Sequence, residues 1–386
     1  MYDVIVVGAG PAGSTAAIAL ARAGRQVLLL DKANFPRDKP CGDMLHPFAI
    51  HTLRKLGVDM ESREFHVLRR VVLFAPDGSP LEWDQTPGTV VPRRVLDHLL
   101  VQLALKEGVS LRRVRVQYPL ITKGVVAGVV GCEDHRVTAF QAPIVIGADG
   151  SKSVIARTLR GGGWPTPYVF VAIRAYFRLA DNAPATTAEL YWNQDLAPGY
   201  GWLFPMGDGV ANVGWGTRLD VLVNRRVNLR TAFAHFLERP PIRAMPPIRT
   251  RLVGPLGPYR AWTLNTCWLV PRRSYPGAVL IGDAGGFIDP LNGGGLHYAL
   301  RTGLLAARVV NEALDGADTS LTSLGRFDAL WRKEFAWQMR LANWIQRHIT
   351  AHPSRVNLAF SPLKWSRLSV FGVYRIAFAI ALRKQL

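Results

Sequence analysis

The 386-residue chain is poor in cysteine, in acidic residues and in long apolar runs. Its three cysteines, Cys41, Cys132 and Cys267, stand far apart, so neither a disulfide framework nor a CxxC metal site can be read from them. No apolar run reaches the length of about 18 residues that a membrane-spanning helix needs. No basic region precedes the apolar N-terminal stretch, which argues against a signal peptide. We therefore expect a cytoplasmic protein without a metal site.

The shortage of acidic residues leaves a strong positive balance. Lys and Arg number 47 against 28 Asp and Glu, for a formal net charge of +19. Such a charge favours anionic partners, which are phosphate-bearing ligands, membrane headgroups or nucleic acid. Apolar residues make up 49% of the chain, which excludes a disordered protein, and the length predicts two or three domains.

A dinucleotide-binding pattern occupies the first thirty residues. Asp3–Val7 is a β-branched run typical of a buried parallel strand, and the Ala-rich stretch Ser14–Ala23 predicts a helix. The sequence between them is Gly8-Ala9-Gly10-Pro11-Ala12-Gly13. A second strand, predicted over Gln26–Leu30, ends at Asp31. Strand, GxGxxG, helix, strand and acid in this order predict a Rossmann-type nucleotide site.

Each part of this pattern has a physical task. Gly8 allows the tight turn, Gly10 lets the backbone approach a pyrophosphate, and Gly13 lets the helix pack closely on the strand. The helix N-terminus offers N–H groups and a positive dipole end to the phosphates. Asp31 can accept hydrogen bonds from ribose hydroxyls. At this stage the dinucleotide could be FAD or NAD.

Two later segments repeat the arrangement of a strand followed by a Gly-rich turn. Ile144–Ile146 leads into Gly147-Ala148-Asp149-Gly150, and Val279–Ile281 leads into Gly282-Asp283-Ala284-Gly285-Gly286. A run of three glycines, Gly293–Gly295, then precedes a helix predicted from Leu296 to about Leu314. Together these segments resemble the DG and GD motifs of flavoproteins with the para-hydroxybenzoate hydroxylase fold. The resemblance implies FAD, with Asp283 on its ribityl or ribose region and the amides of Gly293–Gly295 facing the flavin ring.

The segment Asp31–Asp43 is the most specific signal in the chain. It reads DKANFPRDKPCGD and is similar to the D/E-K-x-x-F-P-R-x-K-x-C-G segment of the geranylgeranyl reductase family of FAD-dependent oxidoreductases. Pro198–Pro205 resembles that family's Y-x-W-x-F-P strand, and Arg93 has the spacing of the family arginine that lies against the flavin. The resemblance runs from Tyr2 to about Asn311. It implies an enzyme that saturates carbon–carbon double bonds in a polyprenyl chain, which is an isoprenoid lipid, a quinone tail or a prenyl diphosphate.

These motifs name the expected cofactor site. Its residues are Gly8, Gly10, Ala12, Gly13, Asp31, Lys32, Cys41, Gly42, Arg93, Asp149, Gly150, Gly282, Asp283, Gly293, Gly294 and Gly295. The chain carries one GxGxxG of this type and no second dinucleotide unit. The reductant is therefore expected to be NAD(P)H that binds transiently, or a protein electron donor.

The chain departs from the family pattern at several positions. Asp43 stands where the family often has Gly, and Gly294 stands where it has an acid between two glycines. His46 and His297 are also unusual there. These departures concern the choice of substrate more than the choice of cofactor.

Other functions fit the sequence less well. Aromatic-ring monooxygenases of this fold read GDAAH where this chain has GDAGG. Flavin-dependent halogenases carry W-x-W-x-I-P and an essential lysine that we do not find here. Basic clusters such as Arg112–Arg115 lie among apolar residues without a nucleic-acid fold signature, so we expect no nucleic-acid partner. A monooxygenase or halogenase acting on a small hydrophobic substrate stays as the alternative.

Reduction of an alkene needs a hydride on one carbon and a proton on the next. The hydride is expected from N5 of reduced FAD. The candidate proton donors are Cys41, His46, His297 and Tyr200, or a water that they hold. The residues expected to line the substrate site are Tyr200, Trp202, Phe204, Trp215 and Tyr298, with a plain sheet core as the other role for such aromatics.

We expect an α/β protein with two lobes and a C-terminal helical region. The Rossmann-type FAD-binding domain is discontinuous and uses residues 1–65, 92–165 and 277–316. A mixed β-sheet substrate domain uses 66–91 and 166–276. Residues 317–386 form a basic, aromatic helical region, which predicts either docking on the inner face of the cell membrane or a solvated cap. A monomer is the favoured state.

Overall fold

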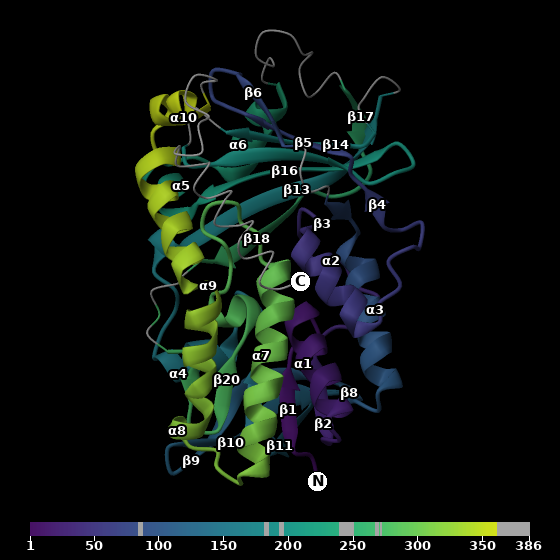
Figure 1. Ribbon diagram of the computed structural model, residues 1–386, viewed down its shortest axis with the longest axis vertical. Helices are drawn as coiled ribbons and strands as arrows, with labels where there is room; N and C mark the ends of the chain where they lie inside the picture. The colour runs from purple at the N-terminus through teal and green to yellow at the C-terminus, as the bar shows by residue number, and fades with distance from the viewer. Residues whose placement is uncertain are drawn as a thin grey trace.

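The lower lobe in Figure 1 is built on a parallel sheet. The computed structural model describes residues 1–83, 88–180, 185–192, 197–238, 251–266, 270 and 272–360. Six strands lie in the order β19-β20-β12-β1-β2-β8, all parallel to their neighbours except β19. Their central members are runs of buried Val, Ile and Leu, as a sheet covered on both faces requires. The strands are β1 (Val4–Val7), β2 (Val27–Asp31), β8 (Ser110–Arg113), β12 (Ile144–Gly147), β19 (Ser274–Tyr275) and β20 (Ala278–Leu280).

Helices cover one face of this sheet and a small second sheet covers the other. The helical face carries α1 (Pro11–Arg22), α3 (Arg93–Lys106) and α7 (Leu296–Asp315), with α1 and α7 side by side (Figure 1). The approach is close, because a Cβ on Gly303 of α7 would lie 2.7 Å from the Ala12 carbonyl oxygen. The opposite face carries β9 (Arg115–Thr122), β10 (Val125–Glu133), β11 (Arg136–Gln141) and α4 (Val154–Arg160).

The upper lobe is a mixed sheet of eight strands. The order is β17-β13-β16-β15-β14-β5-β6, with β18 also paired to β13 and only β14 and β5 parallel. Helices α5 (Leu219–Arg225) and α6 (Leu229–Glu238) cover its outer face. The strands are β5 (Arg70–Phe74), β6 (Pro80–Trp83), β13 (Val169–Leu179), β14 (Thr187–Trp192), β15 (Tyr200–Pro205), β16 (Val210–Arg218), β17 (Leu252–Pro255) and β18 (Arg260–Asn265).

A small sheet joins the two lobes. It consists of β3 (Met44–Leu45), β7 (Thr89–Val90) and β4 (His66–Val67). Helix α2 (Pro47–Leu56) lies between β3 and β4 in the chain. β4 and β7 lie in the range 66–91 that we expected to belong to the substrate domain, yet β7 pairs with β3 of the other lobe and β4 pairs with β7. Among the described residues of that range, β5 and β6 are the strands that join the upper sheet. The chain therefore enters the upper sheet after β4 and leaves it before β7, and these two strands pair with each other.

The C-terminal helices run along both lobes (Figure 1). They are α8 (Leu321–Leu324), α9 (Arg326–Ile345), a π-helical turn η4 (Gln346–Thr350) and α10 (Pro353–Phe360). Helix α9 packs on α7, and Val356 of α10 packs in a cluster with Ala75 and Trp192 of the upper lobe. Short 3-10 turns occur at η1 (Thr166–Tyr168) and η3 (Gly282–Gly285). The remainder of the predicted region, Ser361–Leu386, lies outside the described residues.

The expected fold class is confirmed. Each strand and helix of the nucleotide-binding pattern occurs within a few residues of its predicted bounds, and α7 runs to Asp315 where we expected about Leu314. Among the described residues no helix is long and apolar enough to cross a membrane.

Candidate active site

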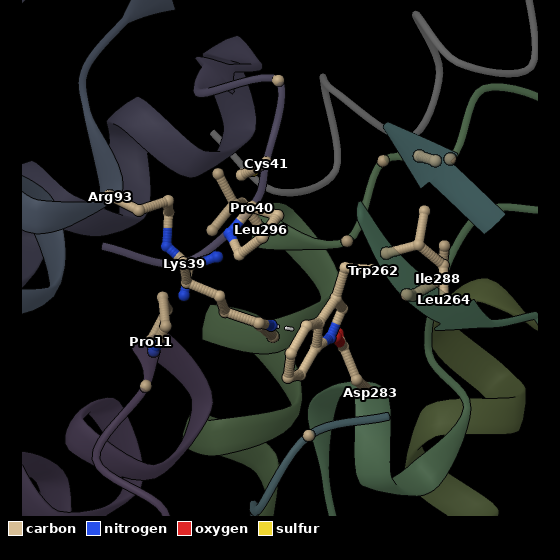
Figure 2. Close-up of a pocket in the computed structure, with 18 of the residues that line it drawn as sticks. Pro11, Lys39, Pro40, Cys41, Arg93, Trp262, Leu264, Asp283, Ile288 and Leu296 are labelled. Atoms are coloured by element: carbon tan, nitrogen blue, oxygen red, sulfur yellow. Dashed lines mark hydrogen bonds and ion pairs between the residues drawn. The ribbon is translucent and has the colours of Figure 1, made fainter. Parts of the chain in front are cut away.

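A cavity of about 1100 Å³ lies between the two lobes. Its walls come from the loops at the carboxyl ends of β1, β2 and β12, from the segment 37–46, from η3 and the turn before α7, and from the inner face of the upper sheet. The carboxyl edge of a parallel sheet is where such folds bind their ligands. The residues drawn in Figure 2 surround this cavity.

The first glycine turn has the geometry that its sequence predicts. Gly8 has a φ of +104°, and its N–H donates to the Leu30 carbonyl at 2.6 Å. A Cβ on Gly13 would lie 1.8 Å from the Gly8 carbonyl oxygen, so this position admits no side chain. A Cβ on Gly10 would instead make only ordinary van der Waals contacts, with Arg37 Nη2 at 3.8 Å and Arg93 Nη2 at 4.0 Å. The backbone at Gly10 thus stays open toward two guanidinium groups, a setting that suits a pyrophosphate.

Asp31 lies at the end of β2 and lines the cavity with its neighbour Lys32. Its carboxylate accepts the N–H of Ala9 at 2.8 Å and the N–H of Ala33 at 2.9 Å. Part of its hydrogen-bonding capacity therefore holds the two loops in place.

Arginine side chains of the segment 37–46 and of α3 share one buried acid. Asp97 is fully buried and accepts Arg93 Nε at 2.6 Å and Nη2 at 2.8 Å, while Arg37 Nη1 lies 3.0 Å from the same carboxylate. One negative charge thus fixes two guanidinium groups beside Gly10. Sequence reasoning placed Arg93 in the site and missed Asp97, although the i,i+4 spacing of Arg93 and Asp97 on a helix was available as a signal.

Asp283 and Asp149 have different roles in the structure. Asp283 lines the cavity and is paired with Lys39 Nζ at 3.2 Å, the contact that is dashed in Figure 2. Asp149 also lines the cavity, but its carboxylate accepts Ser153 Oγ and the N–H of Val154 at the start of α4. Burial raises the pKa of Asp149. Asp149 therefore mainly caps a helix, whereas Gly150 and Asp283 line the cavity. Gly282 is not part of the lining, and its N–H donates to Thr302 Oγ1 at 3.1 Å.

The glycine turn before α7 borders the cavity and is held by hydrogen bonds of its own. Gly293, Gly294 and Gly295 all line the cavity, and Gly293 has a φ of +65°. However, the Gly293 N–H donates to the Asp289 carbonyl at 3.0 Å, and the Gly294 N–H donates to Asn292 Oδ1 at 2.7 Å. Two of the three amides therefore have acceptors within the turn itself, and the expectation that the amides of Gly293–Gly295 face the flavin ring stays a prediction. Helix α7 nevertheless directs its N-terminal end, at Leu296, toward the cavity (Figure 2).

Two buried donors indicate that the cavity receives a polar ligand. Trp262 Nε1 and Arg174 Nε are buried, line the cavity and have no hydrogen-bond partner among the described residues. Figure 2 shows Trp262 beside Lys39 and Asp283. A buried unsatisfied donor costs about 1–3 kcal/mol, which a ligand rich in acceptors would recover. Together with the open backbone at Gly10, these donors fit FAD.

The four candidate proton donors all line the cavity. Burial raises the pKa of the Cys41 thiol, so this group keeps its proton. Burial lowers the pKa of His46 and of His297 to about 3, so both imidazoles are neutral at physiological pH. Tyr200 donates its hydroxyl proton to the Asn292 carbonyl. Assignment of the donor stays a prediction, with the imidazolium form of both histidines disfavoured.

The two histidines belong to an aromatic stack. Phe48 lies between them, with ring centroids 5.1 Å from His46 and 4.8 Å from His297. His46 also caps α2, since its Nδ1 accepts the Phe48 N–H at 3.3 Å. These contacts give both histidines a packing role at the edge of the cavity.

Aromatic residues of β15 line the upper wall of the cavity as expected. Tyr200, Trp202 and Phe204 alternate along the strand, and their ring centroids are 6.1 and 6.2 Å apart. The Trp202 ring lies over Gly214, where a Cβ would be 2.1 Å from it. Tyr298 lines the opposite side with its ring against Phe335.

Trp215 is the one expected substrate residue that the structure removes from the site. It is fully buried on the outer face of the sheet, in a cluster with Phe177 and Phe233. Along β16, Gly216 lines the cavity and Gly214 lies under the Trp202 ring, so Trp215 between them faces helices α5 and α6. A residue on an alternating strand cannot be assigned to a face without the register.

Comparison with known proteins now decides the family. Residues 1–196 match the model of the FAD binding domain, and residues 171–245 match that of the geranylgeranyl reductase catalytic domain. The chain belongs to the geranylgeranyl reductase family of FAD-dependent oxidoreductases. It is an FAD-binding enzyme, and the expectation drawn from its motifs is confirmed at this level.

Relatives with assigned names agree with this family. Digeranylgeranylglycerophospholipid reductase 2 of Methanopyrus kandleri is 33% identical over 355 residues, which cover 88% of this chain and 85% of the relative. Menaquinone reductase of Mycolicibacterium smegmatis is 35% identical over 80% of this chain and 76% of its own length. The crystal structure of a geranylgeranyl bacteriochlorophyll reductase-like protein from Thermoplasma acidophilum has a TM-score of 0.84 at 25% identity, covering 97% of this chain and 95% of that one.

Proposed function

We propose that this reductase of the geranylgeranyl reductase family saturates carbon–carbon double bonds in the polyprenyl chain of a membrane-derived lipid or quinone. The proposal is carried by the apolar end of the cavity. Beyond the aromatic residues of β15, the wall consists of side chains from β5 and β14, namely Val71, Leu73, Leu190 and Trp192. No ionisable side chain stands among these four, which suits a hydrocarbon chain.

Burial of such a chain supplies ample binding energy. One isoprene unit removes four or five carbons from water, which contributes about 3–4 kcal/mol. Two or more units would bind tightly without any specific hydrogen bond. Selectivity would then come from the length and shape of the apolar end, where α10 closes the wall behind Trp192.

The residues of the site have separable tasks in this reaction. Reduced FAD supplies the hydride. Arg37 and Arg93, beside Gly10, would hold the pyrophosphate of the cofactor, and the Lys39–Asp283 pair would border its sugar region. Cys41, whose thiol keeps its proton, is our first candidate for the donor to the second carbon. The stacked neutral histidines help to exclude water from this edge of the cavity.

The reductant and the attachment to a membrane are also proposals. NAD(P)H binding transiently, or a protein electron donor, would reduce the flavin. The outward face of α9 and η4 carries Lys333, Trp337, Arg340, Trp344 and His348 without an acidic residue, and the two tryptophans are 44% and 46% exposed. A basic and aromatic stripe of this kind favours an anionic bilayer surface, where the substrate would be found.

Anaerobic turnover tests the proposed reaction. Reduced holoenzyme is mixed with menaquinone, with a digeranylgeranylglycerophospholipid and with geranylgeranyl diphosphate, and the products are analysed by mass spectrometry. A product that gains two hydrogen atoms and no oxygen supports the reductase. A product that forms only with O2 and gains oxygen, or only with halide, makes the enzyme a monooxygenase or a halogenase.

Vesicle binding tests the proposed attachment. Replacing Trp337 and Trp344 together by Ala should weaken binding to anionic vesicles at high salt, where charge attraction is screened and aromatic insertion persists. Val137→Ala, at an exposed apolar side chain of β11, serves as the control. Unchanged binding of the double variant would mean that α9 is a solvated cap.

A further inference from the structure

Asp43 is a buried carboxylate that the reaction, as described above, does not use. It follows Cys41 and Gly42, lines the cavity and is 0% exposed. Its φ of +63° lies in the left-handed region, which Asp tolerates better than most residues. A charge in this position needs a reason, because burial of an ionised carboxylate is costly unless it is well paired.

Three elements converge on this carboxylate. The Tyr176 hydroxyl of β13 donates to Oδ2 at 2.7 Å, and Asn212 Nδ2 of β16 donates to the same oxygen at 2.8 Å. The backbone N–H of Arg93, at the start of α3, donates to Oδ1 at 3.3 Å. Asp43 therefore connects the segment that carries Cys41 to the upper sheet and to the lower lobe at once.

Asn212 extends the network to Cys41 itself. Its amide nitrogen also donates to the Cys41 carbonyl at 2.7 Å, and its Oδ1 accepts Trp202 Nε1 at 3.0 Å. The Asn212 side chain is oriented by Trp202 on one side and by Asp43 on the other. The position of the Cys41 backbone is thus linked to the ionised state of Asp43.

The ionisation of the Asp43 carboxylate is shifted toward neutral pH. Burial raises its pKa to about 6, against the hydrogen bonds of Tyr176 and Asn212 and the charge of Arg174, which lower it. A proton on Oδ1 would oppose the Arg93 N–H, and a proton on Oδ2 would compete with two donors. The titratable and charged groups around it are Lys39 and Cys41 of its own segment, Arg93 of α3, and Arg174 and Tyr176 of β13.

We propose that Asp43 is a positioning residue whose ionised form holds the Cys41–Gly42 backbone in the shape that binds the flavin, and whose protonation releases it. The inference rests on the proposed function only in that it takes this cavity as the flavin site. Binding of FAD should weaken as the pH falls through the transition of Asp43, without any prenyl substrate being present.

The test measures the dissociation constant of FAD against pH by flavin fluorescence, from pH 5 to pH 8. In the wild type the constant should rise on the order of tenfold as the pH falls below about 6, which is the effect of losing a hydrogen bond to a charged group. Asp43→Asn should bind more weakly than the wild type at pH 8, and its profile should be flat. Tyr176→Phe removes a contact that lowers the pKa, so its midpoint should move to higher pH.

Tyr191→Phe is the matched control. Tyr191 also lies on the upper sheet and donates its hydroxyl to a buried carboxylate, Glu189, but this pair lies outside the cavity lining. Its profile should coincide with that of the wild type. The inference fails if Asp43→Asn keeps the wild-type midpoint, or if the midpoint of Tyr176→Phe does not move. If Asp43→Asn does not fold, Tyr176→Phe decides alone.

These outcomes are independent of the proposed reaction. A shifted midpoint with no turnover of any polyprenyl compound would support the role of Asp43 and remove the proposed substrate. Normal turnover with a midpoint that no variant moves would do the reverse.

Discussion

Two glycines of the same turn should respond differently to substitution by Ala, one through the stability of the protein and the other through its affinity for FAD. Gly13→Ala places a methyl group 1.8 Å from the Gly8 carbonyl oxygen and 3.2 Å from the Ala148 Cβ. Gly10→Ala places one at ordinary contact distance, 3.8 Å or more, from its neighbours, on a backbone with φ of −77° and ψ of −178° that any residue adopts. The first change strains the protein itself, whereas the second obstructs only the ligand.

The expected magnitudes differ accordingly. Overlap with a main-chain oxygen at 1.8 Å requires α1 to move away from β1, so Gly13→Ala should lower the free energy of unfolding by about 3 kcal/mol or more. Gly10→Ala should change the free energy of unfolding of the FAD-free protein by no more than about 0.5 kcal/mol. Its Cβ stands where the pyrophosphate would approach the backbone. We therefore expect FAD affinity to fall at least about tenfold, or roughly 1.4 kcal/mol.

Thermal unfolding with and without FAD separates the two effects. At a cofactor concentration of about 100 times the dissociation constant, FAD should stabilise the wild type by roughly 2.7 kcal/mol. Gly10→Ala should show the wild-type midpoint without FAD and about half of this stabilisation with it, whereas Gly13→Ala should unfold early in both. If Gly10→Ala binds FAD as tightly as the wild type, the space beside Gly10 is not the pyrophosphate site and our placement of the cofactor is wrong.

Three further predictions follow from burial. Asp43→Asn should raise the free energy of unfolding, measured in urea, by up to about 3 kcal/mol at pH 7.5 and by little near pH 4. The reason is that burial raises the pKa of Asp43 from 3.8 to about 6, so the folded wild type loses stability as the pH rises through this window. An equal effect of the substitution at both pH values would contradict this prediction. His297→Phe should reduce the loss of stability on acidification from pH 7.5 to pH 5 by about 2 kcal/mol. The pKa of His297 is lowered in the folded state, so below about pH 6.5 the imidazole takes up a proton in the unfolded state but not in the folded state. An unchanged dependence of the free energy of unfolding on pH would argue against a buried neutral imidazole. Leu73→Trp, at the apolar end of the cavity, should reduce turnover of substrates with a geranylgeranyl chain more than turnover of substrates with a shorter farnesyl chain. An equal loss for both lengths would mean that the prenyl chain binds elsewhere.

Local motifs could be predicted from the sequence because they depend on neighbouring residues. Gly8 and Gly13 act within one turn, and the strand before them and the helix after them are contiguous with it. The run of Val and Ile in β1 is enough to predict a strand buried on both faces. For the same reason the order of strand, turn and helix at Gly282 and at Gly295 could be predicted without knowledge of the tertiary structure.

Features that depend on register or on distant contacts could not be predicted in this way. Trp215 and Trp202 look alike in the sequence, and only the pairing of β15 with β16 places one outside and the other inside. The partners of Asp43 on β13 and β16 lie 133 and 169 residues away along the chain. The sequence marks Asp43 as a departure from the family pattern, but it contains no signal for the groups that surround it.

The segment that carries the strongest sequence signal is also the one that holds the lobes together. Arg37 pairs with Asp97 of α3 at 3.0 Å, which attaches the segment to the lower lobe. The next residue, Asp38, pairs with Arg174 of β13 at 2.6 Å and with Arg260 of β18 at 3.2 Å, which attaches it to the upper sheet.

The following residues continue the same alternation. Lys39 pairs with Asp283 of η3, in the lower lobe, and Asp43 returns to the upper sheet through Tyr176 and Asn212. Partly buried ion pairs of this kind contribute little net stability, but the loss of one partner leaves a costly unpaired charge. Alternating attachment of successive side chains therefore fixes the spacing of the two lobes across the cavity. We expect this spacing to matter more for binding of a ligand in the cavity than for the stability of either lobe.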